Sequence, residues 1–485
     1  MSVAPSIKTK KRDLTNMHEI RPRGAAPKRA RSTVLAVLAA VTLGLTTTGM
    51  APVRQDADEK PQQIGKVGQT DRPDAPTPAT EASSFPKVSG ERCEPTRLGS
   101  KERKAGAAEA CVSTSPAPVK SASRGMLPQT GLMVMSSLAD EGGTDSCKIT
   151  NPGNYAYERF QYCVTGLNVL YTLRDAEGKQ IGTGTLEVST SAKLPEKGTT
   201  WDEHVTVKMT GATGAVTALS AKFRSACTQN CTATKTAPWY GGNLTMGQSV
   251  SGTVSYSSNP APDSQVEFTT SYKLYVTAPG AQITDPNAAW NNPRKIRCDD
   301  AVRDVTGKPN GKPSPGCVIP TVTPVVEMST RPYVKGSPDS GQGAAAASYL
   351  WAQHNLVDGW GIKKPLTRAK YNEEDRRAYT CGNRASVKFG DLKEMLPDDS
   401  CDEFPFASTH EGGTDGGLCA EIIPVFENGG WKILELGDPT PNPNRHCIRA
   451  HVPGPENSSA GSVVRWGYEK QRILDSEEFM LNITS

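Results

Sequence analysis

The side chains best suited to chemistry lie in residues 401–413, which read Cys-Asp-Glu-Phe-Pro-Phe-Ala-Ser-Thr-His-Glu-Gly-Gly. Four ionisable groups, Asp402, Glu403, His410 and Glu411, fall within ten residues of this segment. Adjacent carboxylates beside apolar Phe and Pro side chains are partly desolvated, which favours a bound cation or a carboxyl pKa raised toward that of a general base. We therefore predict these four residues as candidate catalytic groups. The alternative is a solvated acidic loop beside a disulfide.

A second group of oxygen donors, Glu456 and Asn457, lies just before the last predicted helix. Carboxylate and amide oxygens are typical ligands of Mg²⁺, Mn²⁺ or Ca²⁺ rather than of zinc. The N-terminus of the helix and the backbone amides near Gly461 also suit a phosphate oxygen. The hypothesis is that the two stretches converge on one hard divalent cation.

Together these two stretches closely resemble the small secreted bacterial deoxyribonucleases of the NucA/NucB family. The resemblance rests on Asp-Glu-Phe-Pro-Phe-Ala at 402–407, Glu-Gly-Gly at 411–413, Glu-Asn at 456–457 and Ala-Gly-Ser at 460–462. It extends over roughly residues 345–485. The resemblance implies a non-specific endonuclease that hydrolyses DNA and needs a divalent metal, with Mg²⁺ or Mn²⁺ expected. It also implies a small α+β fold related to the ββα-metal arrangement, without the usual catalytic histidine.

The same resemblance implies roles for individual residues. Asp402 would be the general base that activates water, and Glu403 would orient or ligate. The implied metal ligands are Asp402, Glu411, Glu456 and Asn457. In such a site the metal stabilises charge on the phosphodiester and its leaving oxygen, while a carboxylate draws a proton from the attacking water.

Three positions depart from the pattern of the family. Thr409 and His410 stand where the family pattern has Cys and Glu, and Ser458 stands where it has an Arg. In one interpretation of these departures, His410 supplies the acid/base group that the replaced Glu would have provided. In the other, the absence of the Arg at position 458 weakens the contact between the site and the phosphate of the substrate. The candidates to replace that contact or to bind substrate otherwise are Arg445, Arg449, His451, Arg465 and Ser462.

Other functions remain open. In one alternative the nuclease-like domain is inactive, and the secreted protein binds a cell-wall or biofilm polymer through its β-rich domain. A peptidase or lipase is disfavoured because the chain has no Gly-x-Ser-x-Gly and no His-Glu-x-x-His motif. A secreted DNase toxin would predict a cognate inhibitor as partner, and both DNA and RNA remain candidate substrates.

The N-terminus has the pattern of a secretory signal. The first 31 residues hold nine basic and two acidic side chains, and an apolar run of 12 residues, 34–45, follows. A membrane-spanning helix needs about 20 apolar residues, so we predict residues 1–51 as a cleaved signal peptide, with an uncleaved anchor as the alternative. No later segment is apolar enough to span a membrane, which predicts a secreted, extracellular protein.

Net charge limits how the protein can hold nucleic acid. The whole chain carries +4, but removing the predicted signal with its net +7 leaves −3. From residue 341 onward, 15 basic side chains face 21 acidic ones. This region lacks a global basic surface, so any nucleic-acid chemistry must depend on local Arg residues and a metal ion.

The cysteines predict disulfides. Twelve of them, an even number, lie in the exported part, where disulfides persist. Zinc is disfavoured because the chain has no Cys-x-x-Cys pair. The sequence does not fix the connectivity, but pairing neighbours in order keeps every bridge local. In that order the candidates are Cys147 with Cys163, Cys227 with Cys231, Cys298 with Cys317, Cys381 with Cys401 and Cys419 with Cys447, and Cys93 to Cys111 forms a further tethered loop.

The middle of the chain predicts an antiparallel β-sandwich-like domain. Residues 52–131 are rich in Pro, Ser, Ala, Lys and Glu, and read as a disordered linker. Within residues 132–330 apolar residues alternate with polar ones, and turn residues separate the runs. The expected strands include residues 169–173, 184–188, 204–209, 250–256, 266–269 and 272–276.

A Pro- and Gly-rich boundary near residues 331–343 precedes the last domain, residues 336–485. Helices and short strands segregate by region in this domain, which predicts an α+β fold. The expected helices are 344–354, 372–379 and 459–472, and the expected strands are 421–426, 431–436 and 478–483.

Overall fold

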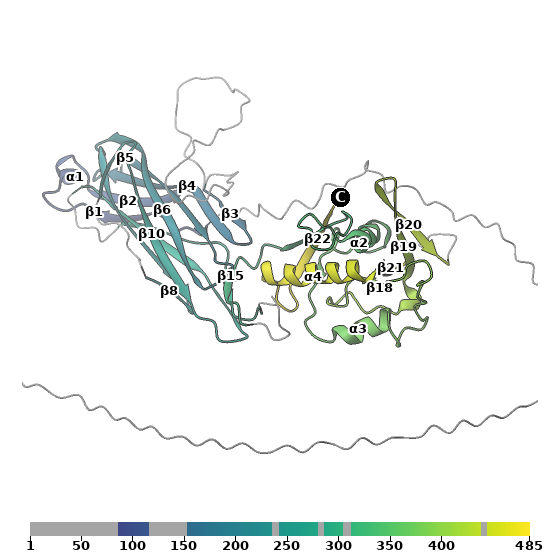
Figure 1. The fold of residues 1–485 in the computed structure, drawn as a ribbon. Coiled ribbons are helices and arrows are strands. Elements are labelled where there is room, and N and C mark those ends of the chain that lie inside the picture. The colour runs from purple at the N-terminus through teal and green to yellow at the C-terminus, as the bar shows by residue number, and fades with distance from the viewer. Residues whose placement is uncertain (1–85, 116–152, 235–241, 280–285, 304–311, 438–443) are drawn as a thin grey trace, which may run out of the picture. The chain divides into compact units, whose positions relative to one another are not determined.

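The structure is a computed structural model that describes residues 86–115, 153–234, 242–279, 286–303, 312–437 and 444–485 (Figure 1). The predicted signal peptide and Cys147 lie outside these residues. Among the described residues, no helix combines the length and the apolar character that crossing a membrane requires.

The first domain is an antiparallel β-sandwich, as the period-2 pattern predicts. Its larger sheet has eight strands in the order β1-β2-β4-β5-β6-β10-β8, with β3 paired to β4, and its smaller sheet has the order β13-β12-β7-β9. Val188 and Val207 from the larger sheet share one core with Phe223 and Leu274 from the smaller sheet. The strands are β1 (Arg92–Pro95), β2 (Glu109–Ser115), β3 (Tyr155–Glu158), β4 (Gln161–Arg174), β5 (Gln180–Lys193), β6 (Thr200–Gly214), β7 (Ala218–Cys227), β8 (Cys231–Ala233), β9 (Gly242–Thr245), β10 (Ser249–Ser258), β12 (Thr270–Thr277) and β13 (Asn287–Asn291).

A third sheet of this region has the order β11-β14-β15. Its strands are β11 (Gln265–Phe268), β14 (Ile296–Asp299) and β15 (Gly316–Val318). The Cys298–Cys317 disulfide joins the facing positions of β14 and β15.

Residues 92–115 are ordered secondary structure, and the prediction of a disordered linker does not hold for them. They form β1, the short helix α1 (Lys101–Lys104) and β2, and the Cys93–Cys111 disulfide joins the two strands. β2 pairs with β4 along its whole length, and Val112 is fully buried. The segment is poor in apolar residues, but β4 pairs with the backbone groups of β2 over residues 109–115.

One carboxylate lies inside the sandwich core. Glu203 of β6 has no exposed surface and accepts hydrogen bonds from the hydroxyls of Tyr256 (2.9 Å) and Tyr272 (2.9 Å). Burial raises the pKa of Glu203 to about 7, against the hydrogen bonds, which lower it. The carboxyl therefore keeps its proton to a higher pH than an exposed glutamate does.

The C-terminal domain is α+β, as predicted. A four-stranded sheet has the order β18-β21-β19-β20, in which β19 and β21 run parallel, and a three-stranded sheet has the order β16-β22-β17. Buried residues of both sheets and of the longer helices form a second core. The elements are β16 (Val325–Ser329), α2 (Gly343–Asn355), β17 (Leu366–Thr367), α3 (Glu373–Thr380), β18 (Asp399–Phe404), η1 (Gly416–Leu418), β19 (Ala420–Glu427), β20 (Gly430–Leu436), β21 (Ile448–Pro453), α4 (Gly454–Lys470) and β22 (Glu478–Thr484).

The three predicted helices are confirmed, with one shift at a boundary. α4 begins at Gly454, five residues before the predicted start, and includes Pro455 in its first turn. A proline in the first turn costs the helix no hydrogen bond, because the N–H groups of that turn have no acceptor within the helix. This shift places Glu456 and Asn457 inside the first turn of the helix rather than before it.

The acidic segment begins in a strand rather than in a loop. Residues 399–404 form β18, which pairs antiparallel with β21 and places Asp402 opposite Ala450 and Glu403 opposite Arg449. Alternate residues of a strand point to opposite faces of its sheet. The strand therefore separates the two adjacent carboxylates onto opposite faces of the four-stranded sheet.

Candidate active site

Asp402 points to the side of the sheet that packs against α2. It is 4% exposed, and the hydroxyl of Tyr349 on α2 lies 2.8 Å from its Oδ1 and 2.7 Å from its Oδ2. The Tyr349 ring packs against Phe404 and, edge to face, against Phe406, with ring centroids 5.6 Å and 5.0 Å away. Burial, followed by the charge of Glu403, raises the pKa of Asp402 well above its ordinary value. The orientation of the Asp402 carboxylate is therefore fixed by the hydroxyl of Tyr349, whose ring is held among the rings of Phe404 and Phe406.

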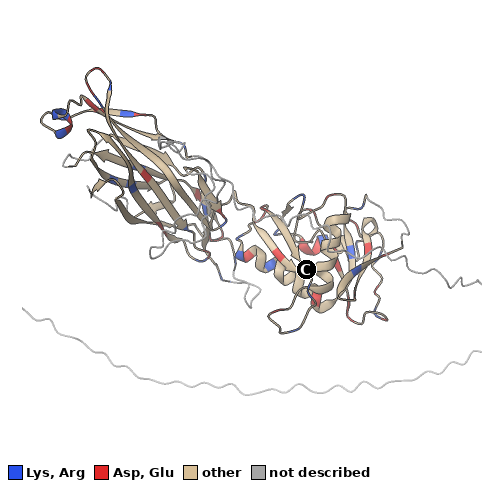
Figure 2. Cartoon of the chain, turned by 90° about the horizontal axis from the view of Figure 1, so that it is seen from above, with Lys and Arg blue, Asp and Glu red and all other residues tan. Residues whose placement is uncertain are grey.

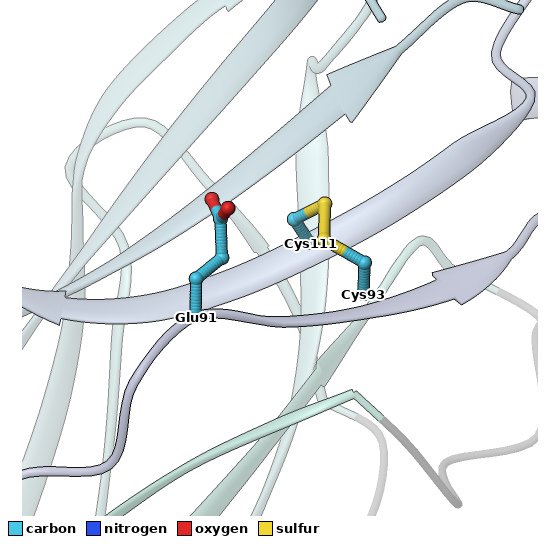
Figure 3. A group of neighbouring side chains, drawn as sticks. All are labelled: Glu91, Cys93 and Cys111. Carbon is cyan, nitrogen blue, oxygen red and sulfur yellow. A yellow bond between two sulfur atoms is a disulfide. The ribbon is translucent and has the colours of Figure 1, made fainter.

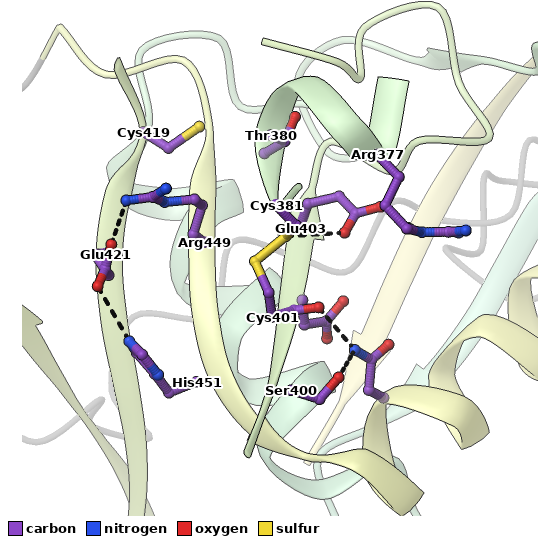
Figure 4. The surroundings of a disulfide bond; sticks show 12 residues. Arg377, Thr380, Cys381, Ser400, Cys401, Glu403, Cys419, Glu421, Arg449 and His451 are labelled. Atoms are coloured by element: carbon purple, nitrogen blue, oxygen red, sulfur yellow. Dashed lines mark hydrogen bonds and ion pairs between the residues drawn. A yellow bond between two sulfur atoms is a disulfide. The ribbon is translucent and has the colours of Figure 1, made fainter. Parts of the chain in front are cut away.

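Glu403 points to the opposite face of the sheet. Its Oε1 lies 3.5 Å from Nε of Arg377, and its Oε2 lies 3.4 Å from Sγ of Cys381, which is bonded to Cys401 (Figure 4). Burial raises the pKa of Glu403, and the charge of Arg377 opposes that rise. Because Asp402 and Glu403 face opposite ways, their side chains lie in separate environments.

Glu456 and Asn457 tie the first turn of α4 to the elements around Asp402. The Nδ2 of Asn457 donates to Oγ of Ser400 (2.9 Å) and to the carbonyl oxygen of Cys401 (3.0 Å). The carboxylate of Glu456 accepts from the backbone N–H of Ala344, in the first turn of α2. These contacts bring the start of α4, the start of α2 and strand β18 together.

Glu456 also completes the N-terminus of α2. The residue before that helix, Gln342, makes no capping hydrogen bond with its side chain, so the first N–H groups of the helix need another acceptor. The pKa of Glu456 is raised by burial, and the hydrogen bond from Ala344 opposes the rise. Gly343 has a φ of +52°, which side-chain-bearing residues rarely adopt, and a Cβ there would lie 2.2 Å from Glu456 Oε2, so this position favours glycine.

His410 and Glu411 dock on the short strand β17. The backbone N–H of His410 donates to the carbonyl oxygen of Thr367 (2.9 Å), and Oε2 of Glu411 accepts from the backbone N–H of Thr367 (2.9 Å). The His410 side chain is exposed, and Glu411 is partly buried. The structure thus gives Glu411 a structural partner on a different strand from Asp402.

The predicted substrate-binding residues divide into two groups. Arg449 is 3% exposed, donates to the carbonyl oxygen of Val387 (2.7 Å) and pairs with Glu421, and Arg445 donates to the carbonyl oxygen of Cys419. These two arginines are held within the protein. Arg465 is exposed on α4, and Ser462 on the same helix is partly buried and donates to the carbonyl oxygen of Ser458 (2.8 Å).

Charges of both signs are interspersed along the elements of the chain (Figure 2). The C-terminal region also has more acidic than basic residues, so its basic side chains do not dominate its charge. A phosphate backbone would therefore meet local basic groups such as Arg465 rather than a continuous basic stripe.

A buried charged cluster on the Glu403 face was not predicted. Nε2 of His451 lies 3.2 Å from Oε1 of Glu421, which also pairs with Arg449 (Figure 4). Nδ1 of the same imidazole lies 2.8 Å from Oδ2 of Asp399. Burial, the largest influence, lowers the pKa of His451, but the hydrogen bonds to Glu421 and Asp399 together raise it above its ordinary value. The imidazole is held between two carboxylates, and Phe389 stacks on it with ring centroids 4.2 Å apart.

One signal of this cluster is present in the sequence. His451 and Arg449 occupy alternate positions of one strand, which places them on one face. Their carboxylate partners belong to strands that become neighbours only in the folded sheet, so sequence spacing does not reveal them.

The described residues contain one group of three His, Cys, Asp or Glu side chains with ligand atoms within 4.8 Å of one another: Glu91, Cys93 and Cys111 (Figure 3). Both sulfur atoms of that group belong to a disulfide, so neither is a thiolate ligand. Within the same residues, Asp402, Glu411 and Glu456 do not form such a group. Asn457, the fourth predicted ligand, contacts the backbone of Cys401, next to Asp402.

Five disulfides are present among the described residues, Cys93–Cys111, Cys227–Cys231, Cys298–Cys317, Cys381–Cys401 and Cys419–Cys447. The pairing of neighbouring cysteines is confirmed for these ten residues. Cys163 is disulfide-bonded as well.

Comparison with known proteins identifies a family for part of the chain. No curated protein matches the chain. A cryo-EM structure of the native conformation of E. coli alpha-2-macroglobulin is similar over 29% of this chain and 9% of its own, with 11% identity and a TM-score of 0.16, which supports no argument about fold or function. The family model for deoxyribonuclease NucA/NucB matches residues 362–437, which confirms the resemblance predicted for the C-terminal region and indicates a nuclease domain there.

Proposed function

We propose that the protein is a secreted, divalent-metal-dependent endonuclease that hydrolyses DNA phosphodiester bonds without sequence specificity. The observation that carries the proposal is the buried carboxylate of Asp402, which lies within the matched segment and is oriented by the Tyr349 hydroxyl. A fixed carboxylate beside a helix N-terminus provides both a proton acceptor and a place for a phosphate oxygen.

Asp402 acts as the general base in this proposal. Its carboxylate takes the proton from the attacking water, and the O–H of Tyr349 holds the carboxylate in one orientation. The pKa of Tyr349 is raised well above its ordinary value by burial and by the charge of Asp402, so the hydroxyl keeps its proton and remains a donor.

Oxygen donors at the start of α4 fit a hard divalent cation. Nδ2 of Asn457 donates hydrogen bonds to Ser400 and Cys401, which leaves the amide oxygen Oδ1 as the atom that can bind a cation. The Glu456 carboxylate is partly buried in the same turn of the helix. Mg²⁺ is commonly held by one or two carboxylates, with water and substrate phosphate in the remaining positions. When bound there, the cation would stabilise negative charge on the phosphate and on the leaving oxygen.

Glu411 and Glu403 have supporting roles in the proposal. Glu411 anchors the segment after Phe406 to β17 through Thr367, and Glu403 holds Arg377 beside the Cys381–Cys401 disulfide. Both contacts fix the two sides of the segment that carries Asp402. Arg465 is the proposed phosphate contact, because its side chain is exposed on the helix that begins with Glu456.

The disulfides support secretion. Five bridges among the described residues need an oxidising compartment to form and persist. We propose that residues 1–51 direct export and are removed.

Removal of divalent metal tests the proposal. The full chain, oxidised, is incubated with supercoiled plasmid and Mg²⁺ or Mn²⁺, with and without excess EDTA. We expect nicked and then fragmented DNA with metal, no cutting in EDTA, and recovery when metal is restored. Cutting that persists in EDTA would overturn the metal dependence, and an intact plasmid with every divalent metal tested would overturn the nuclease assignment.

Replacement of Tyr349 by Phe tests the positioning of the base. The ring and its packing stay, but the carboxylate of Asp402 loses its donor, and a hydrogen bond to a buried charged group contributes about 1.5–3 kcal/mol. We expect kcat for plasmid cleavage to fall about 10- to 100-fold with little change in KM. The matched control is Tyr371→Phe, whose side chain is 64% exposed. Equal kcat in the two variants would show that Tyr349 does not position the base.

A further inference from the structure

We propose that a pocket between α2 and the β19–β20 hairpin is a second DNA site, which takes an unstacked base of a single strand on its aromatic wall and a neighbouring phosphate at Arg331. The pocket has a volume of about 390 Å³, and its walls include Trp351, Phe426, Trp431 and Arg331. The volume lies in the range of small-ligand sites and is ample for one base. The proposal rests on the proposed function for the identity of the polymer.

The aromatic wall comes from a cross-strand pair on a rigid hairpin. Phe426 faces Trp431 in the register of β19 and β20, with ring centroids 5.0 Å apart. The connecting turn has Asn428 and Gly429 at positive φ (51° and 76°), the conformation of a type I′ turn that keeps two strands in tight register. The wall is therefore preorganised, and binding costs little conformational entropy.

The two aromatic rings of this pair have different roles. The indole N–H of Trp431 donates to the carbonyl oxygen of Thr330 (2.7 Å), which fixes the ring against the end of β16. Phe426 remains 46% exposed, so its ring is open to a ligand. Stacking of a base on an aromatic side chain contributes about 1–3 kcal/mol and tolerates any base, as a non-specific enzyme requires.

The charge at the rim favours an anionic ligand over a neutral sugar. Lys432 is neutralised by Glu427, with Nζ 2.5 Å from Oε2. Arg331 is exposed, and Nε of its guanidinium lies 3.4 Å from Oγ of Ser329, which is an uncharged group. Arg331 thus adds a positive charge at the edge of the aromatic wall, and a phosphate group would complement it.

The pocket lies on a different side of α2 from Asp402. Ala347, Leu350 and Trp351 line the pocket, and their spacing of three and four residues defines one face of the helix. Tyr349, which binds Asp402, is two residues before Trp351 and so points about 200° around the helix axis from it. A strand held in the pocket is therefore separated from the proposed cleavage point by the width of α2, and the pocket should affect substrate affinity rather than the chemical step.

Binding of a labelled oligonucleotide tests the second site without any cleavage. The full chain is titrated in EDTA against fluorescein-labelled single-stranded (dT)₁₂, and the anisotropy gives Kd. We expect Phe426→Ala to raise Kd about tenfold, within the range of stacking energies. We expect Arg331→Ala to raise Kd about threefold or more and to reduce the slope of log K against log salt by about 0.7, the value for one phosphate contact to a single strand.

Two control variants are matched to these changes. Met395→Ala shortens another exposed apolar side chain of the C-terminal domain, and Lys335→Ala removes an equal charge near Arg331 but outside the pocket. Both should bind the oligonucleotide as the unaltered chain does. If Phe426→Ala and Arg331→Ala bind as tightly as their controls, the pocket is not a DNA site. Quenching of tryptophan fluorescence by a chitin oligosaccharide but not by (dT)₁₂ would overturn the proposal in favour of a sugar site.

Failure of this proposal is distinguishable from failure of the proposed function. Loss of (dT)₁₂ binding in Phe426→Ala, with an intact plasmid at every metal tested, would support a DNA-binding pocket and reject the nuclease activity. Plasmid cleavage with unchanged binding in both pocket variants would support the nuclease activity and reject the pocket. If both proposals hold, Phe426→Ala should raise KM for single-stranded DNA and leave kcat within about twofold.

Discussion

Replacing Asp402 by Asn is expected to lower kcat for plasmid cleavage about 10²- to 10⁴-fold, the range that a general base contributes. The amide has nearly the same shape, and its oxygen still accepts from the Tyr349 hydroxyl, but it cannot take a proton from water. The fold should tolerate the change, because the amide is neutral and burial of the position, which is 4% exposed, penalises the charge of the carboxylate. The thermal midpoint should therefore stay the same or rise while activity is lost.

The comparison variant for this test is Asp398→Asn, which removes a carboxylate from an exposed position just before β18. Initial rates of plasmid nicking are measured for both variants at saturating metal. We expect the Asp398→Asn rate to equal that of the unaltered chain within about twofold. An Asp402→Asn chain that cuts as fast as Asp398→Asn would exclude Asp402 as the base, and attention would move to the other carboxylates of the domain.

Local patterns in the sequence were enough to predict most of the elements. The alternation of apolar and polar residues in β5 is matched by alternating buried and partly buried positions. The expected strands 421–426 and 431–436 are present as β19 and β20. The pairing of cysteines that are neighbours in the sequence also predicted the bridges that are present. Cys298 and Cys317, for example, occupy facing positions of the adjacent strands β14 and β15 and form a disulfide. These features depend on residues that are close together in the chain.

The features that were missed depend on partners far away in the chain. Tyr349 and Asp402 are 53 positions apart, and Ala344 and Glu456 are 112 positions apart, so no spacing in the sequence signals either hydrogen bond. Strand β18 was not among the expected strands, and three of its six residues, Asp399, Asp402 and Glu403, are acidic. Its pairing with β21 overrides that composition, since the neighbouring strand satisfies its backbone groups. Candidate residues of a site were thus predictable by type, but their partners and directions required the fold.

The stability of the β-rich domain should fall as pH rises from about 4.5 to above 7. The Glu203 carboxyl has its ordinary pKa of 4.5 in an unfolded chain and a pKa of about 7 in the core, where burial disfavours its charge. A raised folded pKa means that the native state binds this proton more tightly, so its stabilising effect is complete below pH 4.5 and is lost as pH rises through 7. The difference between the two limits is about 3 kcal/mol, at 1.36 kcal/mol for each pKa unit.

Urea unfolding of the full chain at pH 5 and at pH 8 measures this effect, with Glu203→Gln as the test variant. Gln keeps the size of the side chain and an oxygen that accepts from Tyr256 and Tyr272, but it is neutral at both pH values. The pH dependence that remains in the variant belongs to other groups, such as His451, so the contribution of Glu203 is the difference between the two chains. Glu177→Gln, at an exposed turn, should keep the full dependence. If Glu203→Gln loses as much stability between pH 5 and pH 8 as the unaltered chain does, the core carboxyl does not titrate in this range, and its tyrosine partners must hold it in one charge state throughout.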